Sequence, residues 1–181
     1  MEDSIDGIRQ DLNRVRPGSD TSAVAVTGRL LYLARHFTAQ RETELRAFDL
    51  TVADFDVLAT LRRRAGDTGL NARDVQRAVM VTSGGMTKRL DRLEQAGLIE
   101  RHADPTDRRG VLIRLSDQGR SKIDETLDAM LDVERRTLEH ALPAQADRAR
   151  LEDLLRQLLL AFERSETPHA AASMAIVRPK R

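Results

Sequence analysis

The sequence of 181 residues contains no cysteine and no tryptophan, and aromatic residues make up only 3% of it. Without cysteine, disulfides, thiolate zinc sites and thiol-based redox sensing by this chain are excluded. The longest apolar runs are only a few residues, far short of the roughly 20 needed to cross a bilayer. The sequence starts with MEDSIDGIRQ, which has no cationic start and no apolar run, so no signal peptide is expected. We therefore expect a cytoplasmic protein with no membrane partner.

The residues that are present suit a helical globule. Apolar residues make up 40% of the chain and charged residues 33%, which is typical of a globular domain. The net charge of +1 is unevenly placed, because residues 62–114 carry 12 Lys and Arg against 7 Asp and Glu, a net of +5, and the rest carries −4. A basic middle between acidic ends favours a DNA-contacting segment, although a solvated basic face without a partner has the same pattern.

Apolar residues at helical spacing predict two helices in the first 50 residues. A short amphipathic helix over about residues 5–15 ends at the Pro-Gly pair of residues 17–18. A longer helix runs from about Ser22 to Arg46, and His36 lies on or beside its apolar side. This histidine is either packed or a contact to a small-molecule effector.

The middle of the chain predicts a helix-turn-helix. Thr51 is expected to cap one helix, with Asp54 completing a capping box. Asn71 caps a short helix that ends near Ala78, and a second helix follows over Thr82–Ala96. Two short helices joined by a few residues, the second polar at its N-terminus, are typical of a DNA-reading unit.

The second of these helices is expected to have one apolar and one polar side. Its apolar positions are Met86, Leu90 and Leu93, which at helical spacing lie within about 40° of one another. Thr82 or Ser83 is the expected N-cap, which places Gly84-Gly85 inside the first turn. The glycine pair is either a loop remnant or a way to bring the helix N-terminus close to backbone phosphates.

A β-hairpin wing is expected after this helix. Gly97 ends the helix, Leu98–Arg101 and Val111–Leu115 form strands, and the residues between them form a polar tip. Arg108 or Arg109 at the tip can enter a minor groove, or Asp107 can pair with Arg109 and stiffen the loop. The expected DNA contacts are Ser83, Gly84, Thr87, Lys88, Arg92, Gln95, Arg108 and Arg109. Lys88 can read guanine or only a phosphate.

The C-terminal part predicts two more helices. Ser116 caps a long helix to about His140, and Pro143 begins a last helix that is apolar around more than one face. Such a helix suggests burial by a second subunit. Residues 165–181 are expected to form a disordered tail.

The run from Leu50 to Ser116 resembles the MarR family of winged-helix transcriptional regulators. The resemblance is carried by FDVLATL (55–61), VTSGGMTKRLDRLEQAGLIER (81–101) and DRRGVLIRLSDQG (107–119). It implies a mainly α fold with a small β-hairpin wing, in which residues 51–115 bind DNA and residues 1–50 and 116–164 join two subunits. It also implies a homodimer on a pseudo-palindromic double-stranded DNA operator, acting as a repressor that a small anionic or aromatic effector releases.

The extra N-terminal helix is similar to that of the urate-responsive branch of this family. The resemblance implies an effector site at Asp56, Arg89 and Arg101, to which His36 is added as a candidate. The branch also uses a tryptophan, whose position falls near Leu12, and this chain has none. Asp56, Arg89 and Arg101 can equally serve as a structural set of ion pairs.

An enzyme is not expected. The four histidines have no carboxylate or thiol at metal or catalytic-triad spacing, and no phosphate-binding or zinc-protease motif occurs. We predict no catalytic residue, no metal and no cofactor. The alternative to a DNA-binding regulator is a helical dimeric protein-interaction module without direct DNA readout.

Overall fold

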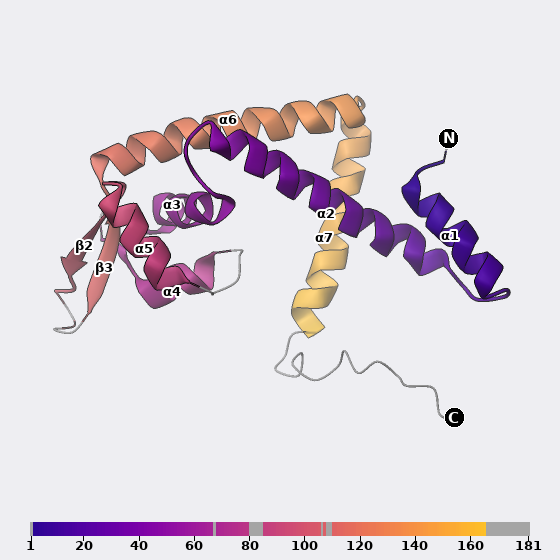
Figure 1. The fold of residues 1–181 in the computed structure, drawn as a ribbon, viewed down its shortest axis with the longest axis horizontal. Coiled ribbons are helices and arrows are strands. Elements are labelled where there is room, and N and C mark those ends of the chain that lie inside the picture. Colours follow the sequence, from indigo (N-terminus) through magenta and orange to yellow (C-terminus); the bar gives the residue numbers. More distant parts are fainter. Residues whose placement is uncertain (1, 67, 80–84, 106, 108–109, 166–181) are drawn as a thin grey trace. The chain divides into compact units, whose positions relative to one another are not determined.

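The computed structural model describes residues 2–66, 68–79, 85–105, 107 and 110–165. The chain forms two compact units, Met1–Met130 and Leu131–Arg181. Figure 1 labels the elements, which in chain order are α1 (Ser4–Val15), α2 (Ser22–Arg46), α3 (Val52–Arg64), β1 (Leu70–Asn71), α4 (Ala72–Ala78), α5 (Met86–Gln95), β2 (Ile99–Ala103), β3 (Val111–Leu115), α6 (Asp117–Ala141) and α7 (Gln145–Ser165). A mainly α fold with a small β-sheet confirms the predicted fold class.

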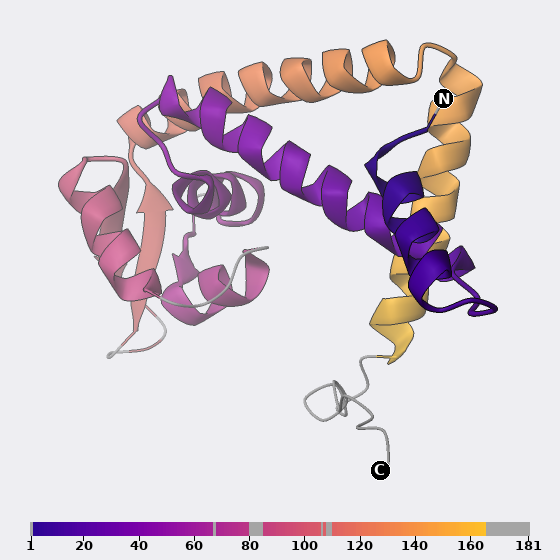
Figure 2. The same ribbon diagram turned by 45° about the vertical axis from the view of Figure 1, so that its right-hand side comes forward.

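Helix α3 is the centre of the core of the first unit. Every residue from Asp54 to Leu61 is buried, and α3 contacts α2, α4 and β3 (Figures 1 and 2). The largest fully buried side chains around it come from the other elements of this unit and include Leu45, Val75, Ile99, Ile113 and Ile123. These aliphatic residues build the core with almost no aromatic contribution, as the composition requires.

The predicted caps at Thr51, Asn71 and Ser116 are confirmed. The Thr51 side chain accepts from the Asp54 N–H while the Asp54 side chain accepts from the Thr51 N–H, a complete capping box. The Asn71 side chain accepts from the Asp74 N–H at 2.9 Å. The Ser116 hydroxyl accepts from the Gly119 N–H at 2.9 Å. Each cap satisfies helix N–H groups that have no partner within the helix.

The wing belongs to a three-stranded antiparallel sheet in the order β1-β3-β2. The predicted hairpin is present, with Ile99 opposite Leu115 and Ala103 opposite Val111. Its first strand begins at Ile99 and ends at Ala103, so the predicted strand Leu98–Arg101 was too short. The strand β1 was not predicted, because two residues are too few to show an alternating pattern.

Gly119 allows α6 to begin directly against Leu98, in the short link between α5 and β2. A Cβ at this position would lie 1.8 Å from the carbonyl oxygen of Leu98. The Ser116 N–H also donates to that carbonyl at 3.1 Å. The start of α6 is therefore fixed to the strand that leads into the wing.

Helix α1 is held on α2 by one apolar and one charged contact. Ile5 is buried against Gly28. The Arg29 guanidinium donates to Asp3 and Asp6 at 2.8 Å each. The hydrogen bond from Arg29 lowers the pKa of Asp3, and the hydrogen bond from the Asp3 N–H, together with that from Arg29, lowers the pKa of Asp6. The rest of the expected apolar side of α2 stays open, since Val26 and Leu33 are exposed.

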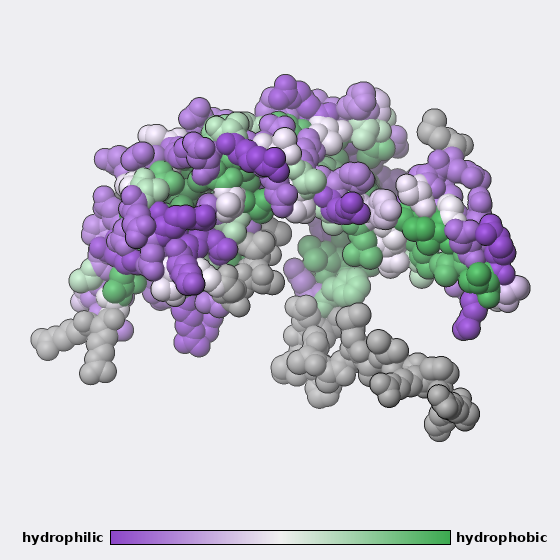
Figure 3. All heavy atoms as spheres, in the orientation of Figure 1, coloured by the Kyte–Doolittle hydropathy of each residue, from purple (hydrophilic) through white to green (hydrophobic). Residues whose placement is uncertain are grey.

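The second unit contains the end of α6 and all of α7, and its apolar side chains are exposed. Hydrophobic surface is visible over α7, and separately over α1 (Figure 3). The exposed large apolar residues of this unit are Leu131, Leu138, Leu151, Leu154, Leu155, Leu158, Leu159, Leu160 and Phe162. The last helix begins at Gln145, two residues after Pro143, so proline is not its first residue as predicted.

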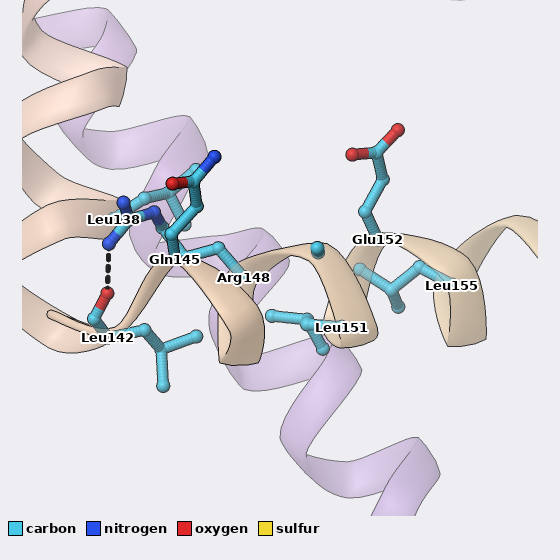
Figure 4. A pocket seen from close by; sticks show the side chains of 8 residues that line it. Leu138, Leu142, Gln145, Arg148, Leu151, Glu152 and Leu155 are labelled. Carbon is cyan, nitrogen blue, oxygen red and sulfur yellow. Dashed lines mark hydrogen bonds between the residues drawn. The ribbon is translucent and has the colours of Figure 1, made fainter.

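A cavity of about 510 Å³ lies where α6 turns into α7 (Figure 4). Leu138, Leu142, Leu151 and Leu155 give it apolar walls. The Arg148 guanidinium donates to the carbonyl oxygens of Leu142 at 2.5 Å and of Pro143 at 2.8 Å. Among the residues that the structure describes, no helix combines the length and the apolar character needed to cross a membrane.

Candidate nucleic-acid interface

Helix α5 separates its side chains as predicted. Met86, Leu90 and Leu93 are buried in the core of the first unit. Lys88 and Gln95 are exposed on the opposite side, and Thr87 is exposed on the flank between the two sides. The apolar spacing therefore fixes which side of the helix is available to a partner.

The N-terminus of α5 differs from the prediction. The helix begins at Met86, and Gly85 is its N-cap in a left-handed conformation, with φ of 84°. Gly85 therefore precedes the helix and does not lie in its first turn. This backbone conformation favours glycine, and Gly85 has no side chain to cap the first N–H groups. Thr82, Ser83 and Gly84 lie outside the described residues.

Arg101 of β2 neutralises acidic residues of α5. Its guanidinium donates to Asp91 at 2.6 Å and also pairs with Glu94. Because both carboxylates of the second half of α5 are paired, the positive charge of Lys88 is less opposed on the exposed side. Arg101 thus has the structural ion-pair role that was one of its two predicted roles.

Arg92 also has a partner. Its guanidinium pairs with Asp54 of α3, whose side chain is only 4% exposed, while the Arg92 side chain is 55% exposed. The sequence predicted Arg92 as a DNA contact and Asp54 only as part of a helix cap. No local pattern signals a pair of residues 38 positions apart.

The described part of the wing tip is closed by backbone hydrogen bonds. The Asp104 N–H donates to the Gly110 carbonyl at 3.0 Å, and the Gly110 N–H donates to the Asp107 carbonyl at 2.8 Å. Arg108 and Arg109, the predicted minor-groove contacts, lie outside the described residues.

The structure brings Asp56 near Arg89 and leaves Arg101 in a separate cluster. Asp56 is buried in α3, and burial raises the pKa of its carboxyl group. The charges of Arg41, Arg63 and Arg89 oppose that rise. Arg41 of α2 and Arg63 of α3 were not predicted, and only their positive charge in the sequence pointed to such a role. The carboxylate thus links helices α2, α3 and α5 electrostatically.

His36 is exposed and is not packed into the core. With Tyr32 and Leu33 of α2, and with Asp3, Ser4, Ile5 and Arg29, it lines a cavity of about 210 Å³ between α1 and α2. None of the other candidate effector residues, Asp56, Arg89 and Arg101, lines this cavity. The candidate effector residues therefore lie at more than one place. Among the described residues, no group of three or more histidine or acidic side chains is placed to hold a metal ion.

Known sequences agree with this arrangement. A family model described as "MarR family" matches residues 48–110, which contain α3, β1, α4, α5 and β2. The HTH-type transcriptional regulator PecS of Dickeya dadantii is 32% identical over 131 residues, covering 72% of this chain and 79% of PecS. The multiple antibiotic resistance protein MarR of Escherichia coli K12 is 34% identical over 93 residues, covering 51% of this chain and 62% of MarR.

Solved structures agree as well. AbsC, a MarR family transcriptional regulator from Streptomyces coelicolor, has a TM-score of 0.67 at 26% identity, covering 82% of this chain and 98% of AbsC. A mutant MarR from E. coli complexed with operator DNA has a TM-score of 0.63 at 26% identity, covering 82% of this chain and 97% of that chain. The resemblance read from residues 50–116 is thereby confirmed. This chain belongs to the MarR family of winged-helix transcriptional regulators.

Proposed function

We propose that this regulator binds a pseudo-palindromic double-stranded DNA operator as a homodimer and represses transcription until a small effector releases it. The observation that carries the proposal is the exposed side of α5. Lys88 and Gln95 lie opposite a buried apolar stripe, Thr87 is exposed on its flank, and a β-hairpin follows the helix. A helix with these exposed donors suits the major groove, where side chains read base edges.

The DNA contacts divide by the kind of readout. Thr87, Lys88 and Gln95 are the candidates for base edges, with Lys88 also able to hold a phosphate. Ser83 and Gly84 precede the N-terminus of α5, where free N–H groups suit a phosphate. Arg108 and Arg109 remain the proposed minor-groove contacts of the wing. Arg92 was predicted with this set, and its pairing with Asp54 gives it a second role, which is developed below.

Exposed apolar residues support the homodimer. In the first unit, Ile8 and Val15 of α1 and Leu31 of α2 are exposed, and in the second unit the leucines of α7 are exposed. A monomer rarely leaves so many large aliphatic side chains in water. A subunit that pairs through such helices holds two copies of α5 at a fixed spacing.

The effector proposal rests on buried charge. The buried Asp56 of α3 is subject to the charges of Arg41 of α2 and Arg89 of α5, and Arg101 holds α5 to β2. A small anionic or aromatic molecule that bound among such groups, with His36 as a further candidate, would shift α5. Binding that favours the form unable to hold DNA lowers the population on the operator.

The test begins with a duplex that the wild-type protein selects from a random-sequence library. Lys88→Ala is expected to weaken binding to that duplex by roughly tenfold and to reduce the magnitude of its salt slope by about one if Lys88 holds a phosphate. Lys122→Ala in α6 makes the same change outside α5 and is the matched control. Failure of the wild type to select any sequence would contradict the proposal and favour a protein-interaction module.

A further inference from the structure

An ion pair connects α5, the proposed DNA-reading helix, to α3 at the centre of the core. Asp54 is in the first turn of α3 and Arg92 is in the last turn of α5. We infer that this pair is a strut that sets the rotation of α5 about its own axis. Arg92 is then a positioning residue that acts on DNA through the orientation of α5. This inference rests on the proposed DNA-reading function of α5.

Each oxygen of the Asp54 carboxylate has its own donors. One oxygen, Oδ2, accepts from the Thr51 N–H at 3.1 Å and from the Thr51 hydroxyl at 2.6 Å. The other, Oδ1, accepts from the Arg92 guanidinium. A carboxylate that is 4% exposed is costly to keep charged without such partners. Asp54 therefore depends on Arg92 more than the half-exposed Arg92 depends on Asp54.

The ion pair supplies the direction that apolar packing lacks. The buried stripe of α5 holds the helix against the core, but hydrophobic contact is not directional. A charge-assisted hydrogen bond between a guanidinium and a fixed carboxylate is directional. Because Arg92 follows Lys88 by one helical turn, the rotation that places Arg92 on Asp54 also decides where Lys88 points.

The Arg92 side chain borders open space. A cavity of about 320 Å³ lies at this point. Its lining includes both members of the pair, the apolar side chains of Leu50 and Leu93, and the charged side chains of Arg46 and Asp49. If Asp54 lost its charge, Arg92 would have room to move, and α5 would lose its fixed rotation. The competing role is a direct contact from the exposed part of Arg92 to a DNA phosphate.

Two duplexes distinguish a strut from a phosphate contact. One is the duplex selected by the wild type, and the other has an unrelated sequence. Asp54→Asn has the same shape and keeps an oxygen for Thr51, whereas Arg92→Gln removes the charge of the partner. On the strut account each variant loses roughly tenfold on the selected duplex, a size expected for a residue that acts without touching the ligand. Affinity for the unrelated duplex and the salt slope are unchanged.

A double variant tests whether the two residues act as one. Asp54→Asn with Arg92→Gln should bind the selected duplex no more weakly than the worse single variant, because both remove the same interaction. Additive losses would overturn the inference. So would an Arg92→Gln variant that weakens binding to both duplexes and reduces the salt slope by about one, since that is the behaviour of a phosphate contact.

Thr51→Ala is the matched control for general destabilisation. It removes the hydroxyl from the same capping box but leaves the pair of Asp54 and Arg92 in place, so it should lower Tm without changing affinity for the selected duplex. An equal loss of affinity in Thr51→Ala and Asp54→Asn would contradict the strut. If Asp54→Asn does not fold, Arg92→Gln alone still separates the two roles by the duplex comparison. A wild type that selects no sequence would instead refute the proposed function, and the strut with it.

Discussion

Helices α5 and α7 both carry rows of large apolar side chains, but among the described residues only those of α5 are buried. Met86, Leu90 and Leu93 of α5 are buried in the first unit, whereas Leu154 and Leu159 of α7 are more than half exposed. The same kind of sequence pattern therefore serves two purposes. In α5 it completes a core and orients a polar side outward, and in α7 it leaves an exposed apolar surface that the proposed homodimer would bury.

The largest effect is expected from charging the open side of α7. Leu154→Glu should abolish self-association, because it places a carboxylate in an apolar contact. Operator affinity should then fall about 10²-fold or more, since the two copies of α5 no longer bind the operator together. Sedimentation and fluorescence anisotropy measure the two effects. Gln157→Glu adds the same charge to the same helix at a polar position and should change neither.

Shortening a buried side chain of α5 should give the next largest effect, which is a loss of stability. Leu90→Ala removes a buried side chain and is expected to lower the free energy of unfolding by about 2–5 kcal/mol. The loss should persist at every protein concentration. Leu154→Ala is the matched variant in α7, and its loss of stability should grow as the protein is diluted. If the stability loss depended on protein concentration in the same way for both variants, the contrast between a covered α5 and an uncovered α7 would be wrong.

Replacing Asp56 should raise the stability of the fold at neutral pH, in contrast to the variants above. Burial raises the pKa of its carboxyl group, so the charged form is disfavoured in the folded state. Wild-type stability should therefore fall as pH rises from the ordinary value of 3.8 through the raised folded pKa. Asp56→Asn should show a modestly higher Tm at neutral pH and lose the effector response. A lower Tm would mean that the nearby arginines contribute more than burial costs.

The smallest effect is expected from Arg62 and Asp124, which join α3 to α6 at the surface. The guanidinium donates to the carboxylate at 2.6 and 3.2 Å and holds the pKa of Asp124 below its usual range. The contribution of this pair is present above the unfolded pKa and is lost as pH falls through the lowered folded pKa. Arg62→Gln should lower Tm only slightly, and the difference from wild type should vanish in acid or at high salt.

The local parts of the fold were predictable from the sequence. The caps at Thr51, Asn71 and Ser116 depend on residues only three positions apart, and the stripe of α5 depends on helical spacing alone. The bounds of α2, Ser22–Arg46, were also predicted correctly. Such features are encoded within a few residues and survive in any fold that buries the apolar side.

The remaining features depend on residues that are distant in sequence. The pair of Asp54 and Arg92, the pairing of Arg101 with Asp91 and Glu94, and the two residues of β1 appear only when the chain is folded. The predicted start of α5 was wrong because Gly85 adopts a left-handed conformation that its neighbours in the sequence do not indicate. The candidate effector residues lie at more than one place in the structure. The sequence could not show this, because a resemblance names positions and not their contacts.

The central claim is that two copies of this chain present two copies of α5 to one DNA site. Analytical ultracentrifugation of the wild-type protein with its selected duplex tests it most directly. We predict two chains per duplex and a selected sequence with two inverted half-sites about one helical turn apart, roughly 10 base pairs between centres. One chain bound per duplex, on a sequence without inverted repeats, would contradict the account.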